Sequence, residues 1–257
     1  MMCISVLPLK SIHLALIRRT LLLLSTMVCF PTLSSFLLTR YPGPYNFLRA
    51  ISDQFTAAGA KATFFFNGNN FDCIYNANRV ADVQYAYAAG HMVASHTWSH
   101  ADLTTLTSAQ LVDSMYRSEE FLSRIVGVRP AFMRPPFGSY NQEVQTVSAD
   151  RGQSLALWDY DTGDADGNTP AQSKAIYDSV INNNAINALI LEHETLGTTA
   201  NTLVPYAINL FKSKGYKLVT LAECLGVDAY QAVGIPQQRT VSLPLPATSL
   251  LSILTSQ

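Results

Sequence analysis

The chain has 257 residues, of which 48% are hydrophobic and 14% are charged, and its formal net charge at pH 7 is −1. A chain of this length and composition can bury one large core, and α/β barrels commonly reach this size as a single domain. The nearly balanced charge and the lack of a basic run argue against nucleic acid as a partner. A neutral polymer is compatible with these features.

The N-terminal residues have the order of a targeting signal. Lys10, Arg18 and Arg19 precede an apolar run at residues 21–30. A charged segment followed by a short apolar one predicts a secretory signal or a signal anchor, and the run is shorter than the roughly 20 residues of a membrane-spanning helix. The alternative is translated non-coding sequence that happens to be apolar. Residues 1–38 are therefore assigned to a signal-like segment outside the domain.

The middle of the chain alternates between two kinds of pattern. Short apolar runs predict strands at residues 62–66, 92–95, 131–133, 154–158, 188–191 and 217–220. Longer stretches predict helices at residues 47–58, 77–89, 108–126, 141–151, 170–183 and 199–214. Thr107-Ser108 and Thr169-Pro170 support two helix starts, because they supply capping hydroxyls and a first-turn proline. Strands alternating with helices predict a parallel sheet.

The pattern fades after Ala229. Residues 229–257 contain several prolines, serines and threonines, which predicts a poorly ordered tail. The last apolar run, at residues 250–254, is shorter than the ten or so apolar residues of a lipid-anchor signal. We therefore expect one domain over residues 39–228.

Two histidines four residues apart follow the predicted strand at residues 92–95. His96 and His100 would point the same way if they lay on one turn, and neutral imidazole is the commonest side-chain ligand for zinc-like ions. The pattern predicts two of the three protein ligands of a metal site. The alternative is a pair of surface or capping histidines, because so short a pattern carries no fold information.

Three further motifs come at or after the ends of predicted strands. They read Met133-Arg134-Pro135-Pro136-Phe137-Gly138-Ser139-Tyr140, Trp158-Asp159-Tyr160-Asp161-Thr162-Gly163-Asp164 and Leu189-Ile190-Leu191-Glu192-His193-Glu194. Active sites of α/β barrels lie at the carboxyl ends of the strands. We therefore expect Arg134, Asp161 and His193 to gather there with the two histidines.

The ordered set of four motifs resembles the polysaccharide deacetylases of carbohydrate esterase family 4, the NodB-homology proteins, and most closely their fungal chitin deacetylases. The resemblance covers about residues 43–228. It implies a distorted parallel (β/α) barrel that hydrolyses N-acetyl groups of chitin to give chitosan and acetate. It also implies a divalent metal, zinc or cobalt, an N-acetylated polysaccharide as partner, a monomer, and a secreted protein of the cell wall or extracellular space.

The resemblance assigns roles to the motif residues. His96 and His100 correspond to metal ligands, and His193 to the general acid that protonates the departing amine. Asp161 corresponds to the carboxylate that holds this imidazole, and Arg134 to a residue that orients the catalytic base.

The remaining roles concern the acetyl group. The backbone N–H of Phe137 corresponds to the donor that stabilises the oxyanion. Trp158, Leu191 and Tyr140 correspond to the substrate pocket, with Trp158 and Leu191 as walls around the acetyl group.

One motif departs from the family. Its first strand ends in Thr-Phe-Asp-Asp-Gly-Pro, whose first Asp is the general base and whose second is the third metal ligand. The matching stretch here places Tyr41 and Pro42 before Gly43. Proline cannot coordinate a metal, and tyrosine, with an ordinary pKa near ~10, is a poor base at neutral pH. The first strand and the catalytic competence of the chain are thereby put in question.

Two explanations of this departure stay open. The first is a catalytically impaired relative that keeps a glycan-binding groove. The second, which we favour, is an error in the gene model over residues 1–42, because Arg134, Asp161 and His193 are all retained. Residues 31–39 are rich in residue types encoded by the pyrimidine-rich codons that precede a splice acceptor.

Several motif residues have simpler interpretations. Arg134 precedes two prolines and could be a solvated loop residue. His193 could be the last residue of a strand and have no functional role. Asp159 and Asp166 are interpreted as turn residues, since Asp and Gly dominate turns. His91 is interpreted as a structural histidine before a strand.

The chain has four cysteines, Cys3, Cys29, Cys73 and Cys224. A disulfide from Cys224 to Cys73 or Cys29 would suit an oxidising extracellular setting. Buried free thiols are the equal alternative.

Overall fold

The centre of the molecule is a parallel sheet. The computed structural model describes residues 33–39, 46–70 and 72–237. Its sheet has eight strands in the order β6-β5-β3-β2-β1-β8-β7, with β9 also paired to β1. The strands are β1 (Leu33–Thr39), β2 (Thr63–Phe66), β3 (Met92–Ser95), β5 (Phe132–Met133), β6 (Ser154–Leu155), β7 (Tyr160–Asp161), β8 (Asn187–His193) and β9 (Lys217–Val219). The predicted α/β class is confirmed, and no pairing between the described β6 and β7 closes the sheet.

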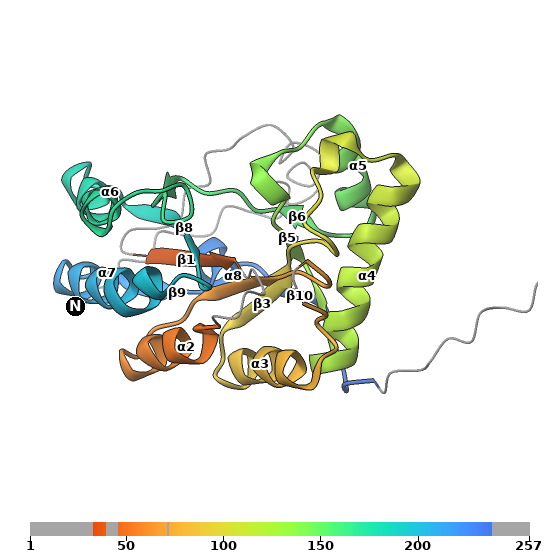
Figure 1. The fold of residues 1–257 in the computed structure, drawn as a ribbon, viewed down its shortest axis with the longest axis horizontal. Coiled ribbons are helices and arrows are strands. Elements are labelled where there is room, and N and C mark those ends of the chain that lie inside the picture. Colours follow the sequence, from red (N-terminus) through yellow and green to blue (C-terminus); the bar gives the residue numbers. More distant parts are fainter. Residues whose placement is uncertain (1–32, 40–45, 71, 238–257) are drawn as a thin grey trace, which may run out of the picture.

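Helices surround this sheet (Figure 1). They are α2 (Leu48–Ala57), α3 (Ala77–Ala88), α4 (Ser108–Val126), α5 (Gln142–Asp150), α6 (Pro170–Asn182), α7 (Val204–Ser213) and α8 (Leu221–Leu225). In Figure 1, α2 and α3 lie together below β2 and β3, α4 and α5 flank the end with β5 and β6, and α6 and α7 flank the end with β8. The predicted helix starts are confirmed, because Thr107 and Thr169 each form a capping box with the glutamine three residues later.

Strand β1 lies in the middle of the sheet. It pairs with β8 along its whole length, from Leu33 beside Asn187 to Thr39 beside His193. On its other side it pairs with β9 through its first residues and with β2 through its last. The predicted domain start at residue 39 is therefore wrong, since the strand begins at Leu33. Tyr41 and Pro42 lie outside the described residues.

The predicted tail also contains structure. Strand β10 (Tyr230–Val233) pairs antiparallel with β4 (Val128–Pro130). The Tyr230 hydroxyl accepts a hydrogen bond from the Val93 N–H at 3.2 Å, and the Gln231 side chain donates to the carbonyl of Pro130 at 2.7 Å. The prediction of a poorly ordered tail from residue 229 is therefore wrong for this strand, which pairs with β4 and contacts β3 through Tyr230. Residues 238–257 lie outside the described part.

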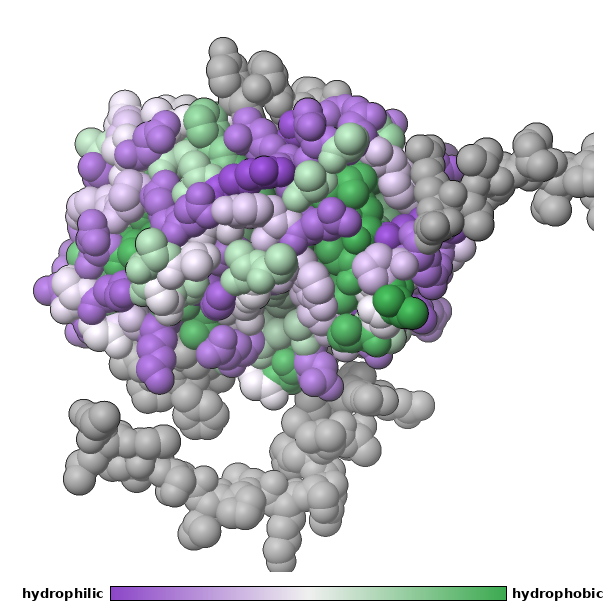
Figure 2. All heavy atoms as spheres, turned by 90° about the horizontal axis from the view of Figure 1, so that it is seen from below, coloured by the Kyte–Doolittle hydropathy of each residue, from purple (hydrophilic) through white to green (hydrophobic). Residues whose placement is uncertain are grey.

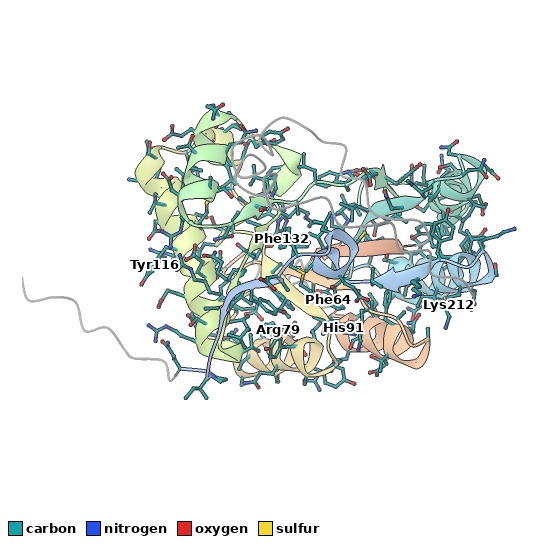
Figure 3. The ribbon with its side chains drawn as sticks, turned by 180° about the vertical axis from the view of Figure 1, so that it is seen from behind. Phe64, Arg79, His91, Tyr116, Phe132 and Lys212 are labelled. Carbon is teal, nitrogen blue, oxygen red and sulfur yellow. The ribbon has the colours of Figure 1, made fainter. Side chains whose placement is uncertain are left out.

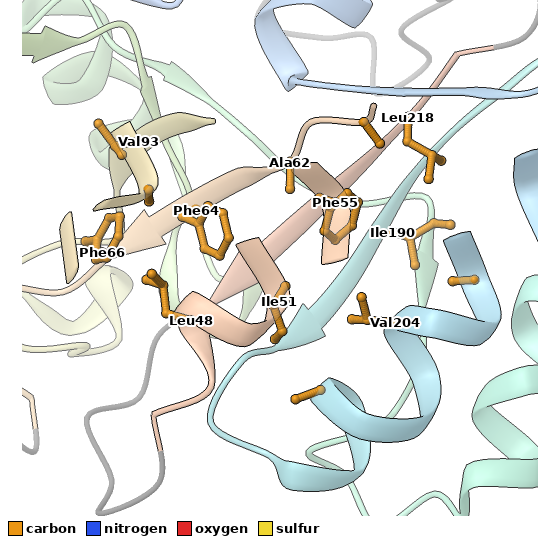
Figure 4. Close-up of a cluster of buried hydrophobic side chains, with 14 of the residues drawn as sticks. Leu48, Ile51, Phe55, Ala62, Phe64, Phe66, Val93, Ile190, Val204 and Leu218 are labelled. Carbon is orange, nitrogen blue, oxygen red and sulfur yellow. The ribbon is translucent and has the colours of Figure 1, made fainter. Parts of the chain in front are cut away.

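The main hydrophobic core lies between the sheet and the helices α2, α3, α4, α6 and α7. Figure 4 shows part of it, with side chains from α2, β2, β8 and α7 in contact: Leu48, Ile51, Phe55, Phe64, Phe66, Ile190 and Val204. Each of these side chains is at most 2% exposed. Burial of one such side chain contributes about 1.5–3 kcal/mol. This packing fixes the positions of β2 and β8. Strand β8 ends at His193, and β2 pairs with β3, which precedes His96.

His91 belongs to this core, as its structural interpretation predicts. Its ring contacts Phe64 edge to face, with centroids 5.3 Å apart (Figure 3). The Ala62 N–H donates to Nδ1 at 3.2 Å, so Nε2 carries the proton and lies 3.0 Å from the Ser52 hydroxyl. Burial lowers the pKa of His91 to about 4.

The outer surface on the side of α2 and α3 is mixed. Polar side chains separate small groups of apolar ones there (Figure 2). This mixture is ordinary, because apolar atoms contribute more than half of the exposed surface of folded proteins. Among the described helices, none is long and apolar enough to cross a membrane.

The cysteines settle part of the predicted pairing. Cys224 is disulfide-bonded, whereas Cys73 is free. The predicted alternative of a bond between these two is therefore wrong. Cys3 and Cys29 lie outside the described residues.

Candidate active site

The motif residues meet at the carboxyl edge of the parallel sheet. The register aligns Ser95 at the end of β3 with Met133 of β5, and Thr39 at the end of β1 with His193 of β8. Asp161, the last residue of β7, lies beside Leu191 of β8. The loops that leave these strands therefore begin at one edge, as predicted from the alternation of strands and helices.

His96 and His100 lie together after β3. Their ring centroids are 4.8 Å apart, with the ring planes at 79°. The predicted reason for this proximity, one helical turn, is wrong. Thr97 and His100 have positive φ angles of 70° and 58°, so an irregular loop with left-handed residues turns both rings inward. Such angles are uncommon for residues other than glycine and often occur at functional sites.

Arg134 contacts both nitrogens of the His96 ring. Nδ1 of His96 donates to the carbonyl oxygen of Arg134 at 2.6 Å, and the guanidinium Nη2 of Arg134 donates to Nε2 at 3.3 Å. The guanidinium carbon lies 5.3 Å from the Phe65 ring centroid and 5.9 Å from that of Trp158. Arg134 is only 1% exposed, so the alternative of a solvated loop residue is wrong.

Both histidines of this pair are uncharged at neutral pH. Burial, with a further contribution from the charge of Arg134, lowers the pKa of His96 well below its ordinary 6.5. Burial and Arg134 lower the pKa of His100 to about 4. Neutral imidazoles carry the lone pairs that a divalent metal requires.

The described residues nevertheless form an incomplete metal site. Within the described ranges, no group of three or more His, Cys, Asp or Glu side chains is arranged to hold a metal ion. His96 and His100 could supply two nitrogen ligands, and Nε2 of His96 faces the cationic guanidinium of Arg134. The donor set therefore fits a divalent ion only in part, which agrees with the proline at position 42.

His193 is held by Asp164. Its Nδ1 lies 2.8 Å from Asp164 Oδ1, and its backbone N–H donates to Asp164 Oδ2 at 2.8 Å. The expectation that Asp161 holds this imidazole is therefore wrong, because Asp161 Oδ1 accepts a hydrogen bond from the Gly163 N–H at 2.9 Å. Asp161 still belongs to β7, and the turn at Gly163, with φ of 62°, brings Asp164 back to the strand end.

The environment keeps Asp164 ionised. Burial alone would raise its pKa, but hydrogen bonds and charge from His193, together with the Thr199 hydroxyl, lower it below the ordinary 3.8. An ionised carboxylate requires a proton on Nδ1 of His193, so proton exchange with a substrate falls to Nε2. His193 also contributes to the lowered pKa values of His96 and His100, which places its charge within electrostatic reach of both.

Phe137 and Gly138 form the turn after Arg134. Phe137 has a φ of 59°, its side chain is 66% exposed, and its ring centroid lies 4.8 Å from that of His100. In the described part of the chain, its backbone N–H donates to no carbonyl or side chain, whereas those of Gly138 and Ser139 close the turn. The role of this N–H as the donor to an oxyanion stays a prediction.

The predicted pocket residues have different environments. A Cβ on Gly138 would lie 3.0 Å from the Trp158 ring, so the indole packs closely against this turn and near Arg134. Leu191 is 4% exposed in β8, and Tyr140 is 40% exposed. The role of Trp158 as a wall agrees with its contacts, while those of Leu191 and Tyr140 stay predictions.

Two residues of the site were missed from the sequence as functional partners. Asp164 stands in a run of aspartates, and only the turn at Gly163 distinguishes it from Asp161. Thr199 is a buried threonine six residues after His193 and donates to Asp164 Oδ2 at 2.7 Å. No motif in the sequence marks it.

Comparisons with known proteins agree with this geometry. Residues 35–156 match the family model for polysaccharide deacetylase. The chain is 35% identical to a chitin deacetylase of Pestalotiopsis sp over 193 residues, covering 75% of this chain and 64% of that protein. It is 34% identical to a chitin deacetylase of Colletotrichum lindemuthianum over 196 residues, covering 74% and 78%. A probable peptidoglycan-N-acetylglucosamine deacetylase of Arthroderma benhamiae is 36% identical over 188 residues, and the chain spans only 42% of it.

The fold gives the same result. The solved structure of the Colletotrichum lindemuthianum chitin deacetylase matches with a TM-score of 0.73 at 32% identity, covering 79% of this chain and 92% of that one. The family match begins inside β1, so residues 35–38 belong to the domain, contrary to the predicted boundary. The chain belongs to the polysaccharide deacetylases of carbohydrate esterase family 4.

Proposed function

We propose that the protein hydrolyses N-acetyl groups of a chitin-type polysaccharide, giving chitosan and acetate. The observation that carries the proposal is the pair of the buried Asp164 and the partly buried His193 at the sheet edge that also bears His96 and His100. The chitin deacetylases among the relatives support the choice of substrate.

The described residues account for two needs of this reaction. His193, with Nδ1 held by the Asp164 carboxylate, can deliver a proton from Nε2 to the departing amine. The Phe137 N–H can donate to the oxyanion of the tetrahedral intermediate. Trp158, packed against Gly138, provides an apolar surface for the acetyl methyl group. Leu191 and Tyr140 complete the proposed pocket.

The family generally depends on a metal, and we propose zinc or cobalt as the ion. His96 and His100 are its proposed ligands. The base and the third ligand of the family pattern are replaced by Tyr41 and Pro42. The gene-model hypothesis loses support for Leu33–Thr39, because this segment pairs in register with three strands and the family match begins within it.

A secreted protein of the extracellular space or cell wall, acting as a monomer, is part of the proposal. The disulfide-bonded state of Cys224 supports an oxidising compartment.

The function is tested by incubating the purified chain, supplied with zinc or cobalt, with N-acetylglucosamine oligomers and measuring free acetate. Release of acetate that disappears in the His193→Ala variant supports the proposal. Parallel assays with peptidoglycan and acetylated xylan define the substrate class. Acetate released only from those polymers contradicts the assignment to chitin.

The alternative function, an impaired relative, is not favoured by the chitin deacetylases among the relatives and solved structures. Its support is local. The Arg134 guanidinium donates to Nε2 of His96, the nitrogen that would bind a metal, and Pro42 stands at the position of the family's third ligand. Both features suit an impaired relative that binds the glycan without cleaving it. Saturable binding of N-acetylglucosamine oligomers without acetate release, with or without zinc, would support this second function.

A further inference from the structure

We propose that Thr199 is a positioning residue that holds the Asp164 carboxylate in the orientation in which it accepts the hydrogen bond from His193 Nδ1. The significance of this arrangement for catalysis rests on the proposed function, in which His193 is the proton donor. The arrangement itself does not depend on turnover.

The hydrogen bonds around Asp164 carry the proposal. Oδ1 accepts one bond, from His193 Nδ1 at 2.8 Å. Oδ2 accepts two, from the His193 backbone N–H at 2.8 Å and from the Thr199 hydroxyl at 2.7 Å. Donors to both oxygens fix the rotation of the carboxylate about its Cβ–Cγ bond. Because the Thr199 bond is the only one of the three that does not come from His193, it ties Asp164 to a separate element.

The chain after β8 places Thr199 at this point. The Leu196 N–H donates to the His193 carbonyl at 3.3 Å, and the Ala200 N–H donates to the Leu196 carbonyl at 3.0 Å. Thr199 then begins a π-helical turn, Thr199–Leu203, that continues into α7. Turns of this kind are rare and occur frequently at functional sites. Thr199 is fully buried, whereas the neighbouring Thr198 is exposed.

The electrostatic surroundings make this hydrogen bond important. Asp164 is almost fully buried, and burial opposes its charge. Among the described titratable groups, Glu192 on β8 lies near Asp164, the two histidines after β3 lie near His193, and the buried Glu194 directly follows His193. Burial raises the pKa of Glu192 well above its ordinary value, and burial keeps His96 and His100 uncharged. Asp164 therefore depends on its own three donors to remain ionised.

The test compares Thr199→Val with Thr198→Val in the full chain. NMR follows the side-chain carboxyl carbon of Asp164 and the Nδ1 proton of His193 across pH, without metal or substrate. We expect Thr199→Val to raise the pKa of Asp164 by about one unit and to speed exchange of the Nδ1 proton with water. Thr198→Val, which removes an exposed hydroxyl, should leave both signals unchanged, and Thr199→Ser should restore them.

An unchanged Asp164 titration in folded Thr199→Val overturns the proposal. If that variant does not fold, Thr199→Ala gives the same comparison without the added methyl group, and an unchanged titration there has the same meaning. Equal shifts in Thr198→Val also contradict the proposal, because they indicate a general loosening of the turn.

The outcome is separable from that of the proposed function. A shifted titration together with no acetate release refutes the function and leaves the positioning role intact. Acetate release together with an unshifted titration does the reverse.

Discussion

The site has two halves: the His193–Asp164 pair is the complete half, and the His96–His100 pair is the incomplete half, because the described residues supply it with no third metal ligand. The His193–Asp164 pair has hydrogen-bond donors on both carboxylate oxygens and a supporting hydroxyl from Thr199. The His96–His100 pair provides two neutral imidazoles, but Nε2 of His96 accepts from Arg134, and the described residues complete no three-ligand group around the pair. The first half is built by β7, β8 and the turn before α7, while the second depends on the residues that follow β1. A local change after one strand can thus disable one half and leave the other intact.

The largest expected effect is on the complete half. In a chain carrying Tyr41→Asp and Pro42→Asp, the further change His193→Ala should lower acetate release by about 10²–10⁴-fold, because it removes the proton donor. The rate is measured on N-acetylglucosamine oligomers. A rate within a factor of about two of the parent would show that this half takes no part in the reaction.

The next effect separates two aspartates. Asp164→Asn in the same background should lower the rate by about 10²-fold, because the amide no longer holds the charged imidazole. Asp161→Asn is the matched control, since Asp161 accepts only the Gly163 N–H among its described partners. Its effect should be several-fold at most. The reverse order of the two effects would restore the expectation drawn from the sequence.

Part of the fold and of the candidate site could be predicted from the sequence. The helix from Ser108 to Val126 was predicted to the residue, because Thr107 caps its start and Gly127, with φ of 77°, ends it. The gathering of Arg134 and His193 followed from the rule that parallel strands end at one edge. These features depend on local chemistry or on topology alone.

Other features depend on tertiary contacts. Strand β1 was missed because serines interrupt its apolar pattern, although β8 and β2 enclose it. Strand β10 forms because β4 presents a free edge to it. The choice of Asp164 over Asp161 depends on how sharply the chain turns at Gly163, which spacing does not reveal.

A third prediction concerns stability and includes a histidine outside the site. His91 and His100 have folded pKa values of about 4, below the ordinary 6.5. The unfolded chain therefore binds more protons between pH 6.5 and 4, and the free energy of unfolding should fall as the pH drops through this window, by about 2 kcal/mol per histidine. Urea unfolding measures it. His91→Gln should remove the contribution of His91 to this fall. An unchanged dependence of the free energy of unfolding on pH would contradict the buried neutral state of His91.

The smallest expected effect tests the incomplete half. Arg134→Gln in the chain as printed should tighten zinc binding by up to about tenfold, because it removes a positive charge beside His96. Arg117→Gln, which removes an exposed charge on α4, is the control. Calorimetric titration measures both. Equal affinities in the two variants would show that Arg134 does not compete with the metal.

The most direct test of the central claim is the rate of acetate release by the Tyr41→Asp, Pro42→Asp chain compared with the chain as printed. Under that claim, the His96–His100 half lacks only the general base and the third metal ligand. Restoring both should therefore raise the rate of acetate release by about 10²-fold or more. It should also create tight zinc or cobalt binding. No gain in rate, with the protein folded and metal-bound, would contradict the account.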